Sequence, residues 1–278
     1  TFSHDVTIGG KELKAGTYGL FLDVEKEGSW YWIFSSASTN WGSYFYDPKQ
    51  DVLRVATQPV DAAYTEYLTF GFDDRELNST TAFLQWDNKR IPFKIEVPNG
   101  IQLYVDKIRS ELHGERTGFT YQPWVEGILF CVQYNLNLEE ALTWADVAIT
   151  EPFIGRENFA TLQAKALVLQ ALKRQAEADE YMQRAIKHPT ATVQDVHAFG
   201  RSLLAAGKTD KAIEIFKYNR QAHPEDKFTT YVGLARGYTA IGDKKNAIKN
   251  WEIAIRNIPD EQKAYLSLYE AELKKLKG

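Results

Sequence analysis

The chain has 278 residues, 44% of them hydrophobic and 25% charged, a composition typical of a globular protein with two domains. Its formal net charge of -4 gives no general basic surface, so we expect neither nucleic acid nor an anionic membrane as a partner. No apolar run reaches the roughly 18 residues of a membrane span, so the sequence predicts no transmembrane segment. The single cysteine, Cys131, excludes an intrachain disulfide, and its apolar helical surroundings predict a buried, inert thiol.

The first hundred residues show hydrophobic alternation with a period of two, which is typical of half-buried strands. Short runs of this kind, broken by Gly, Pro and Asp turns, predict an antiparallel β-sandwich or barrel. Pro92 lies in the last run and suggests an edge strand or a strand start, because proline cannot donate a ladder hydrogen bond. The predicted strands cover residues 2–8, 18–24, 30–34, 53–55, 68–72, 84–86 and 91–97.

Three blocks of this region resemble a known family. They read AGTYGLF at residues 15–21, WGSYFYD at 41–47 and DVLRV at 51–55. In this order they resemble the bacterial family known as domain of unknown function 2911, common in Bacteroidota, over residues 1–97. Members usually carry a further block before the first strand, so the resemblance implies a β domain that is N-terminally incomplete. The family has no established activity, and the resemblance therefore implies none.

Aromatic residues in the second block allow two interpretations. Trp41, Tyr44 and Tyr46 could present flat faces to a glycan, because aromatic rings offer a large contact area at small entropic cost. The alternative is that they fill the core of a small sandwich rich in aromatic residues. We expect the core, and keep the glycan platform as the alternative.

Two carboxylates border the third block. Asp47 and Asp51 are four residues apart and could share a cation, but the sequence DPKQD is more typical of a turn with Asp capping. Arg54 lies inside the following strand, and we expect it to pair with one of these acids. We therefore predict a structural role for all three residues.

Residues 99–122 are predicted to connect the two domains. The tripeptide PNG at 98–100 ends the strands, and apolar residues then recur at helical spacing from Ile101 to Leu112. The polar stretch 115–122, which contains Gly118, is typical of a hinge.

The stretch 193–259 contains nearly the same pattern twice. GKTDKA at 207–212 aligns with GDKKNA at 242–247, and HP at 223–224 aligns with IP at 258–259, each at an offset of 35 residues. Each unit reads as a helix, a glycine-containing turn and a second helix, with proline after its end. A period of this length is typical of stacked helical hairpins.

Small residues extend the repeat back to residue 123. Ala141, Ala178, Ala212 and Ala247 recur at spacings of 37, 34 and 35 residues, which predicts four hairpins and an amphipathic capping helix at 261–277. The units resemble the tetratricopeptide repeat, which implies a right-handed array that binds proteins or peptides. The predicted fold class is therefore α+β with two domains. An antiparallel β domain covers 1–98, a connecting helix and linker cover 99–122, and an all-α repeat array covers 123–278.

The first helix of each hairpin lines the concave face in such arrays, so its positions outside the core are candidates for contact with a partner. Arg201 and Arg236 occupy equivalent positions one repeat apart and could grip a carboxylate or an extended backbone. The interpretation that we favour is that both arginines are solvated or pair with neighbouring acids, and the grip on a partner is the alternative. The predicted partner-facing residues are Gln133, Gln163, Gln170, Gln194, His197, Arg201, Val232 and Arg236.

Motifs of catalysis are missing from the sequence. It contains no His-Glu-x-x-His motif, no paired-cysteine site, no phosphate loop and no Gly-x-Ser-x-Gly elbow. We therefore predict a binding or scaffold protein without catalytic residues, metal or cofactor, which recognises a protein or peptide outside the bacterial cytoplasm, with the cytoplasm as the alternative location. The competing hypotheses are a carbohydrate-binding or sugar-processing protein and a purely structural assembly surface.

Overall fold

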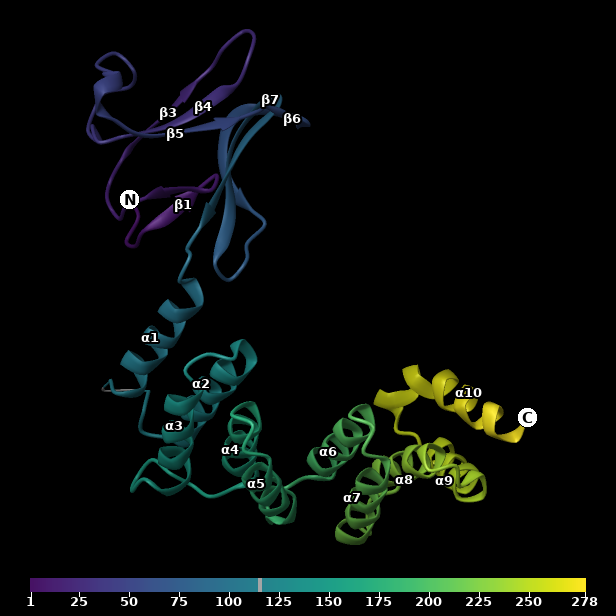
Figure 1. Cartoon of the computed structure of the whole chain (residues 1–278). Helices are drawn as coiled ribbons and strands as arrows, with labels where there is room; N and C mark the ends of the chain where they lie inside the picture. The colour runs from purple at the N-terminus through teal and green to yellow at the C-terminus, as the bar shows by residue number, and fades with distance from the viewer. Residues whose placement is uncertain (115–116) are drawn as a thin grey trace. The chain divides into compact units, whose positions relative to one another are not determined.

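The computed structural model describes residues 1–114 and 117–278, which form two compact units, 1–110 and 111–278 (Figure 1). The first unit contains antiparallel sheets and the second contains repeated helical hairpins, so the predicted fold class is confirmed. The predicted hinge at 115–122 begins with two residues that lie outside the described ones. In the described ranges no helix has both the length and the apolar character that a membrane crossing requires.

Two antiparallel sheets make up the first unit. The larger sheet has the strand order β2-β1-β7-β6 and the smaller has the order β3-β4-β5, with a short 3-10 helix, η1, before β5. The elements are β1 Val6–Ile8, β2 Lys11–Leu13, β3 Gly19–Asp23, β4 Trp30–Ser35, η1 Pro48–Gln50, β5 Asp51–Thr57, β6 Val60–Asp73 and β7 Ser79–Glu96.

Side chains from both sheets share one core, which makes the unit a sandwich. Ile8 of β1 and Phe93 of β7 pack with Trp32 of β4 and Val55 of β5, and all four are buried. The Trp32 and Phe93 ring centroids lie 4.9 Å apart. The period-two pattern directs these side chains to one face of each strand, and their burial stabilises the unit by about 25 cal/mol per Å2 of apolar surface.

Strands β6 and β7 are longer than the sequence pattern predicts. The runs 84–86 and 91–97, expected as separate strands, belong to the single strand β7, and the run 68–72 is only part of β6. Polar residues around Asp87 interrupt the alternation but not the pairing, because β6 changes register there. Pro92 lies within β7, between the segment paired with β6 and the segment paired with β1, and not at an edge strand.

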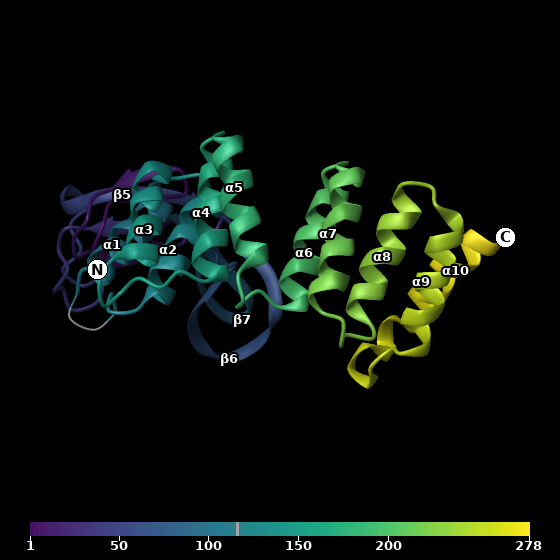
Figure 2. The same cartoon turned by 90° about the horizontal axis from the view of Figure 1, so that it is seen from below.

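The second unit consists of helical hairpins that follow one another along the chain (Figures 1 and 2). Helix α1, Gly100–Leu112, precedes it, and α10 follows the last hairpin after the 3-10 helix η2. The helices are α2 Tyr121–Tyr134, α3 Leu138–Thr150, α4 Phe159–Ala171, α5 Gln175–Lys187, α6 Val193–Ala205, α7 Thr209–Ala222, α8 Thr229–Ala240, α9 Lys244–Arg256, η2 Asp260–Tyr265 and α10 Leu266–Lys277.

The small residues that define the repeat lie at buried positions of the second helix of each hairpin. Ala141, Ala178, Ala212 and Ala247 are all buried, so a larger side chain there would separate the paired helices. Cys131 of α2 is buried as predicted.

The hairpins pack unequally along the array. Helices α2 and α3 pack closely on α4, and α6 and α7 pack closely on α8. Among the described residues, no helix of the α4–α5 hairpin packs comparably on a helix of the α6–α7 hairpin. This junction is the most open of the three at the backbone, although buried side chains of all four helices, among them Met182 and Leu203, still form one core.

Candidate functional site

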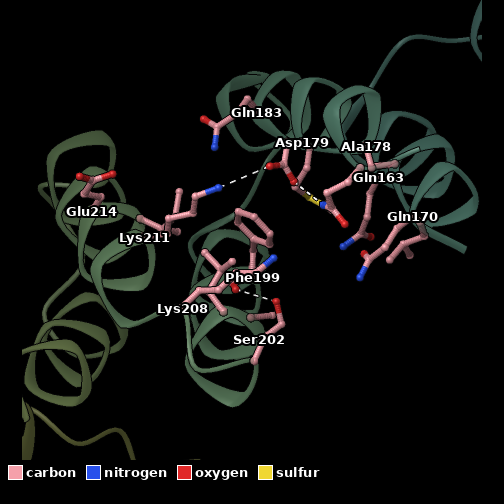
Figure 3. A pocket seen from close by; sticks show the side chains of 18 residues that line it. Gln163, Gln170, Ala178, Asp179, Gln183, Phe199, Ser202, Lys208, Lys211 and Glu214 are labelled. Carbon is pink, nitrogen blue, oxygen red and sulfur yellow. Dashed lines mark hydrogen bonds and ion pairs between the residues drawn. The ribbon is translucent and has the colours of Figure 1, made fainter. Parts of the chain in front are cut away.

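A cleft of about 580 Å3 lies at the open junction between the α4–α5 and α6–α7 hairpins (Figure 3). Its lining spans residues 163–170 of α4, 175–183 of α5, 198–203 of α6 and 211–215 of α7, together with Ala206 and Lys208 of the α6–α7 turn. Met182, Leu203 and Ile215 form an apolar, buried floor. A volume of this size is typical of a ligand site.

The rim of the cleft is polar and without net charge. Lys208 and Lys211 lie on it together with Asp179 and Glu214, so two positive and two negative charges balance. Lys211 Nζ of α7 pairs with Asp179 Oδ2 of α5 at 3.4 Å across the cleft (Figure 3).

Glutamine amides complete the rim. Gln163 and Gln170 of α4, both predicted to meet a partner, line the cleft, and Gln183 of α5 lines it beyond Asp179 (Figure 3). In the part of the chain that the structure describes, no hydrogen bond is formed by these three side chains. Each amide therefore offers both a donor and an acceptor to a ligand.

A basic cluster on α6 and α8 contains three further predicted residues. Arg201 of α6 and Arg236 of α8 are close enough that the Arg201 charge lowers the pKa of Arg236, second to the effect of burial, while Tyr269 and the charge of Glu272 act in the opposite direction. Neither guanidinium lies within ion-pairing distance of a carboxylate in residues 1–114 and 117–278. The buried Nε of Arg236 also lacks a hydrogen-bond partner there.

His197 lies between these arginines and the core. Its ring centroid is 5.6 Å from that of Phe216, and its buried Nδ1 has no hydrogen-bond partner among the described residues. Burial, followed by the charges of Arg236 and Arg201, lowers the pKa of His197 to about 4. The imidazole is therefore neutral near pH 7, and the positive charge of the cluster belongs to the arginines.

Of the other predicted partner-facing residues, two are exposed and one is buried. Gln133 of α2 and Gln194 of α6 are exposed. Val232 of α8 is only 4% exposed and packs in a core with Trp251 of α9 and Tyr269 of α10. Val232 is therefore not available to a partner, because the last two helices cover its side of α8.

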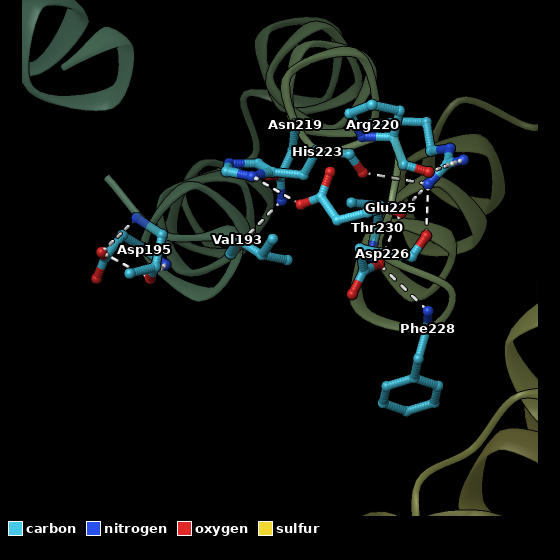
Figure 4. A network of polar contacts seen from close by, with 11 residues as sticks. Val193, Asp195, Asn219, Arg220, His223, Glu225, Asp226, Phe228 and Thr230 are labelled. Carbon is cyan, nitrogen blue, oxygen red and sulfur yellow. Dashed lines mark hydrogen bonds and ion pairs between the residues drawn. The ribbon is translucent and has the colours of Figure 1, made fainter. Parts of the chain in front are cut away.

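A network of polar contacts fixes the turn between α7 and α8 (Figure 4). The Arg220 guanidinium donates to the main-chain oxygens of Asp226 at 2.6 Å and Pro224 at 3.0 Å. The Asp226 carboxylate accepts from the main-chain nitrogens of Phe228 at 3.2 Å and Thr230 at 2.8 Å. These contacts hold the start of α8, and so the helix that carries Arg236, against α7.

Asn219 explains a departure of the third unit from the repeat pattern. It stands where the other units have a small residue, and it is fully buried. Its Nδ2 donates to the main-chain oxygen of Val193 at 3.0 Å, at the start of α6 (Figure 4). Periodicity alone gives no signal for this contact, because the acceptor is a backbone atom of another helix.

The aromatic block of the β domain is more exposed than predicted. Trp41 and Tyr44 are 81% and 80% exposed, so the expectation that they fill the core is wrong. Tyr46 differs, because its hydroxyl donates to Asp51 at 2.8 Å and its ring lies 5.2 Å from that of Phe21. Burial and the Asp51 contact raise the pKa of Tyr46.

The acidic residues of this block have the expected structural contacts. Asp47 caps η1 by accepting from the main-chain nitrogen of Lys49 at 3.0 Å. Asp51 Oδ2 pairs with Arg54 Nη1 at 3.0 Å, which confirms the predicted pairing of Arg54 with one of these acids.

A protein-family model matches part of the first unit. The model of a family described as Protein of unknown function (DUF2911) matches residues 1–95, which confirms the resemblance of the β domain. No curated protein matches the chain. The solved structures named MamA AMB-1 and MamA MSR-1 are similar to this chain at 13% and 14% identity, with TM-scores of 0.35 and 0.33. Each match covers 55% of this chain, and 89% and 92% of the respective structures.

Proposed function

We propose that this protein is a non-enzymatic binding protein whose helical array captures an acidic segment of a protein or peptide partner. The observation that carries the proposal is the cluster of Arg201, Arg236 and His197, in which two neighbouring guanidinium groups have no carboxylate partner among the described residues. In this proposal the units 123–278 act as tetratricopeptide-type repeats, with α10 as the capping helix.

Electrostatics favours an acidic ligand at this cluster. Two like charges on adjacent helices repel each other, and Arg236 is partly removed from water, so a carboxylate between them would relieve both effects. A guanidinium binds a carboxylate through two parallel hydrogen bonds, which fixes orientation as well as charge.

The β domain has a supporting role in this proposal. The domains are 1–98, the connector 99–122 and the array 123–278, and the first of these fixes the location of the protein or adds a second contact. We propose that the protein acts in the periplasm or elsewhere outside the bacterial cytoplasm. Fractionation of the source cells with antibody detection tests this assignment.

The proposal is tested by selecting random peptides displayed on phage with the full chain as bait. We expect enrichment of acidic peptides that the double variant Arg201→Ala/Arg236→Ala does not reproduce, with binding weakened about tenfold or more. The matched control is Arg174→Ala/Arg184→Ala, which removes the same charge from arginines already paired with Glu177 and Glu157. Equal enrichment by the two double variants would contradict the proposal.

A second candidate function is favoured by the exposure of Trp41 and Tyr44. The Tyr44 ring lies 4.9 Å from the neighbouring Phe45 ring, so several aromatic faces meet water on one loop. Rings of this kind stack on sugars. In this alternative, wild-type protein binds members of a glycan array and Trp41→Ala/Tyr44→Ala does not, and absence of glycan binding by the wild type would exclude it.

A further inference from the structure

The cleft exists because equivalent positions differ between two junctions of the array. With the 35-residue offset of the repeat, Ala198 is equivalent to Gly233 and Ser202 to Gly237. A Cβ atom on Gly233 would lie 2.6 Å from the Phe216 ring, so the glycines let α8 press against α7. Ala198 and Ser202 of α6 line the open cleft instead.

The helix opposite shows the same contrast. With a 34-residue offset between α5 and α7, Asp179 stands in the position of Ile213 and Met182 in that of Phe216. Ile213 and Phe216 are buried at the closed junction. Burying the Asp179 carboxylate would cost free energy, and it instead pairs with Lys211 at 3.4 Å. The rim of the cleft is therefore polar, while its floor is apolar.

We infer that this cleft receives one large apolar side chain of the partner segment whose carboxylate the Arg201–Arg236 pair binds. The inference rests on the proposed function and deepens it by adding a second anchor. The floor offers apolar contact that is shielded from water, and the balanced charges of the rim favour an uncharged stretch of the segment. The free amides of Gln163, Gln170 and Gln183 offer hydrogen bonds to its main chain.

Helix α6 sets the spacing of the two anchors. Arg201 and Ser202 are neighbours on this helix, and Arg201 lies near Arg236 of α8 while Ser202, about 100° further around the helix axis, lines the cleft. A helix with its side chains is about 10 Å wide, and an extended chain advances about 3.3 Å per residue. The acidic and apolar residues of the ligand are therefore about three to four positions apart, and the small, exposed Ala198 lets the chain cross between them.

The test uses the full chain and peptides selected from the displayed library. We expect an acidic residue with Leu, Ile, Met or Phe three or four positions away, and a serine in place of that apolar residue weakens binding about tenfold or more. In the Ser202→Trp variant the indole fills the cleft. We expect this variant to bind the apolar peptide and its serine-substituted form equally, and still to prefer peptides with the acidic residue. Thr143→Trp is the matched control, because both hydroxyls are exposed and donate to the carbonyl three residues earlier.

Each outcome separates the inference from the function on which it rests. Acidic peptides without an apolar preference, or equal discrimination by Ser202→Trp and Thr143→Trp, would overturn the inference and leave the proposed function standing. If the selected peptides share an apolar residue but bind equally well to the Arg201→Ala/Arg236→Ala variant, the proposed function would be overturned. The inference that one peptide occupies both the arginine pair and the cleft would then fail as well. A library that yields no peptide above background would overturn both.

Discussion

Two junctions of the helical array use equivalent positions and reach opposite results. Between α6–α7 and α8–α9, two glycines of α8 receive the buried side chains of Phe216 and Ile213. Between α4–α5 and α6–α7, a charged residue, Asp179, stands in the position of Ile213 and the junction holds a cleft. The repeat thus gives a closed junction or an open cleft when a few interface residues change, while its helices keep the same order.

The largest expected effect comes from deleting the ring that closes one junction. Phe216 is fully buried, so Phe216→Ala should lower the free energy of unfolding of the array by about 3 to 5 kcal/mol. Met182→Ala, at the equivalent position beside the cleft, should cost only about 2 kcal/mol, because the cleft already exposes part of its surroundings. Urea unfolding followed by far-ultraviolet circular dichroism measures both, and equal losses would contradict the difference between the junctions.

A second variant pair fills space at the two junctions. Gly233→Leu forces a side chain against the Phe216 ring and should destabilise the array by about 3 kcal/mol. Ala198→Leu adds a similar side chain at the exposed equivalent position and should change stability by about 0.5 kcal/mol or less. The same unfolding measurement applies, and a tolerated Gly233→Leu would show that the junction is not closely packed.

The buried imidazole makes stability depend on pH. The pKa of His197 is about 4 in the folded chain, below its ordinary value, so the unfolded chain takes up the proton first. Its contribution is complete above about pH 6.5 and is lost as pH falls toward 4, by about 3 kcal/mol. The charged groups that face it are Arg201, Arg236 and Asp226.

His197→Gln should flatten this part of the stability profile, measured by urea unfolding at several pH values. The exposed His4 of the other unit provides the control variant His4→Gln. A wild-type profile that does not fall between pH 6.5 and pH 4, relative to that of His197→Gln, would contradict the burial of the imidazole.

The smallest expected change in stability comes from a substitution that makes the α4–α5/α6–α7 junction resemble the closed α6–α7/α8–α9 junction. Asp179→Ile removes an exposed ion pair worth about 1 kcal/mol or less and adds a side chain that can pack, so stability should rise by about 1 kcal/mol. Closure should also slow oxidation of Met182, the only methionine of the chain, by hydrogen peroxide. Asp146→Ile, which removes an exposed partner of Lys165, is the control, and oxidation as fast as in that control would contradict closure.

The fold could be predicted from local sequence patterns. Hydrophobic alternation with a period of two marks the buried face of a strand, and the recurring small residues mark the buried contact between two paired helices. Local pattern also predicted that Arg54 pairs with a neighbouring acid, since the two are close in sequence. The pattern did not predict that β7 is a single strand. The polar residues around Asp87 stay in the strand because β6, the strand paired with them, changes register there, and the sequence of β7 alone does not show this.

The candidate site was less accessible to sequence reasoning. Arg201 and Arg236 follow from the repeat, but Val232 is buried because α9 and α10 cover it, which no local pattern reports. The cleft was missed, although its signal is present once the units are aligned. Asp179 is a charged residue at a position where the next unit has Ile213.

Hydrogen exchange of the full chain, with and without a saturating acidic peptide from the selection, tests capture by the array most directly. We expect slower exchange in α6 and α8, which carry Arg201 and Arg236, and no such protection in the Arg201→Ala/Arg236→Ala variant. Protection confined to residues 1–110, or equal protection in the variant, would contradict the proposed function.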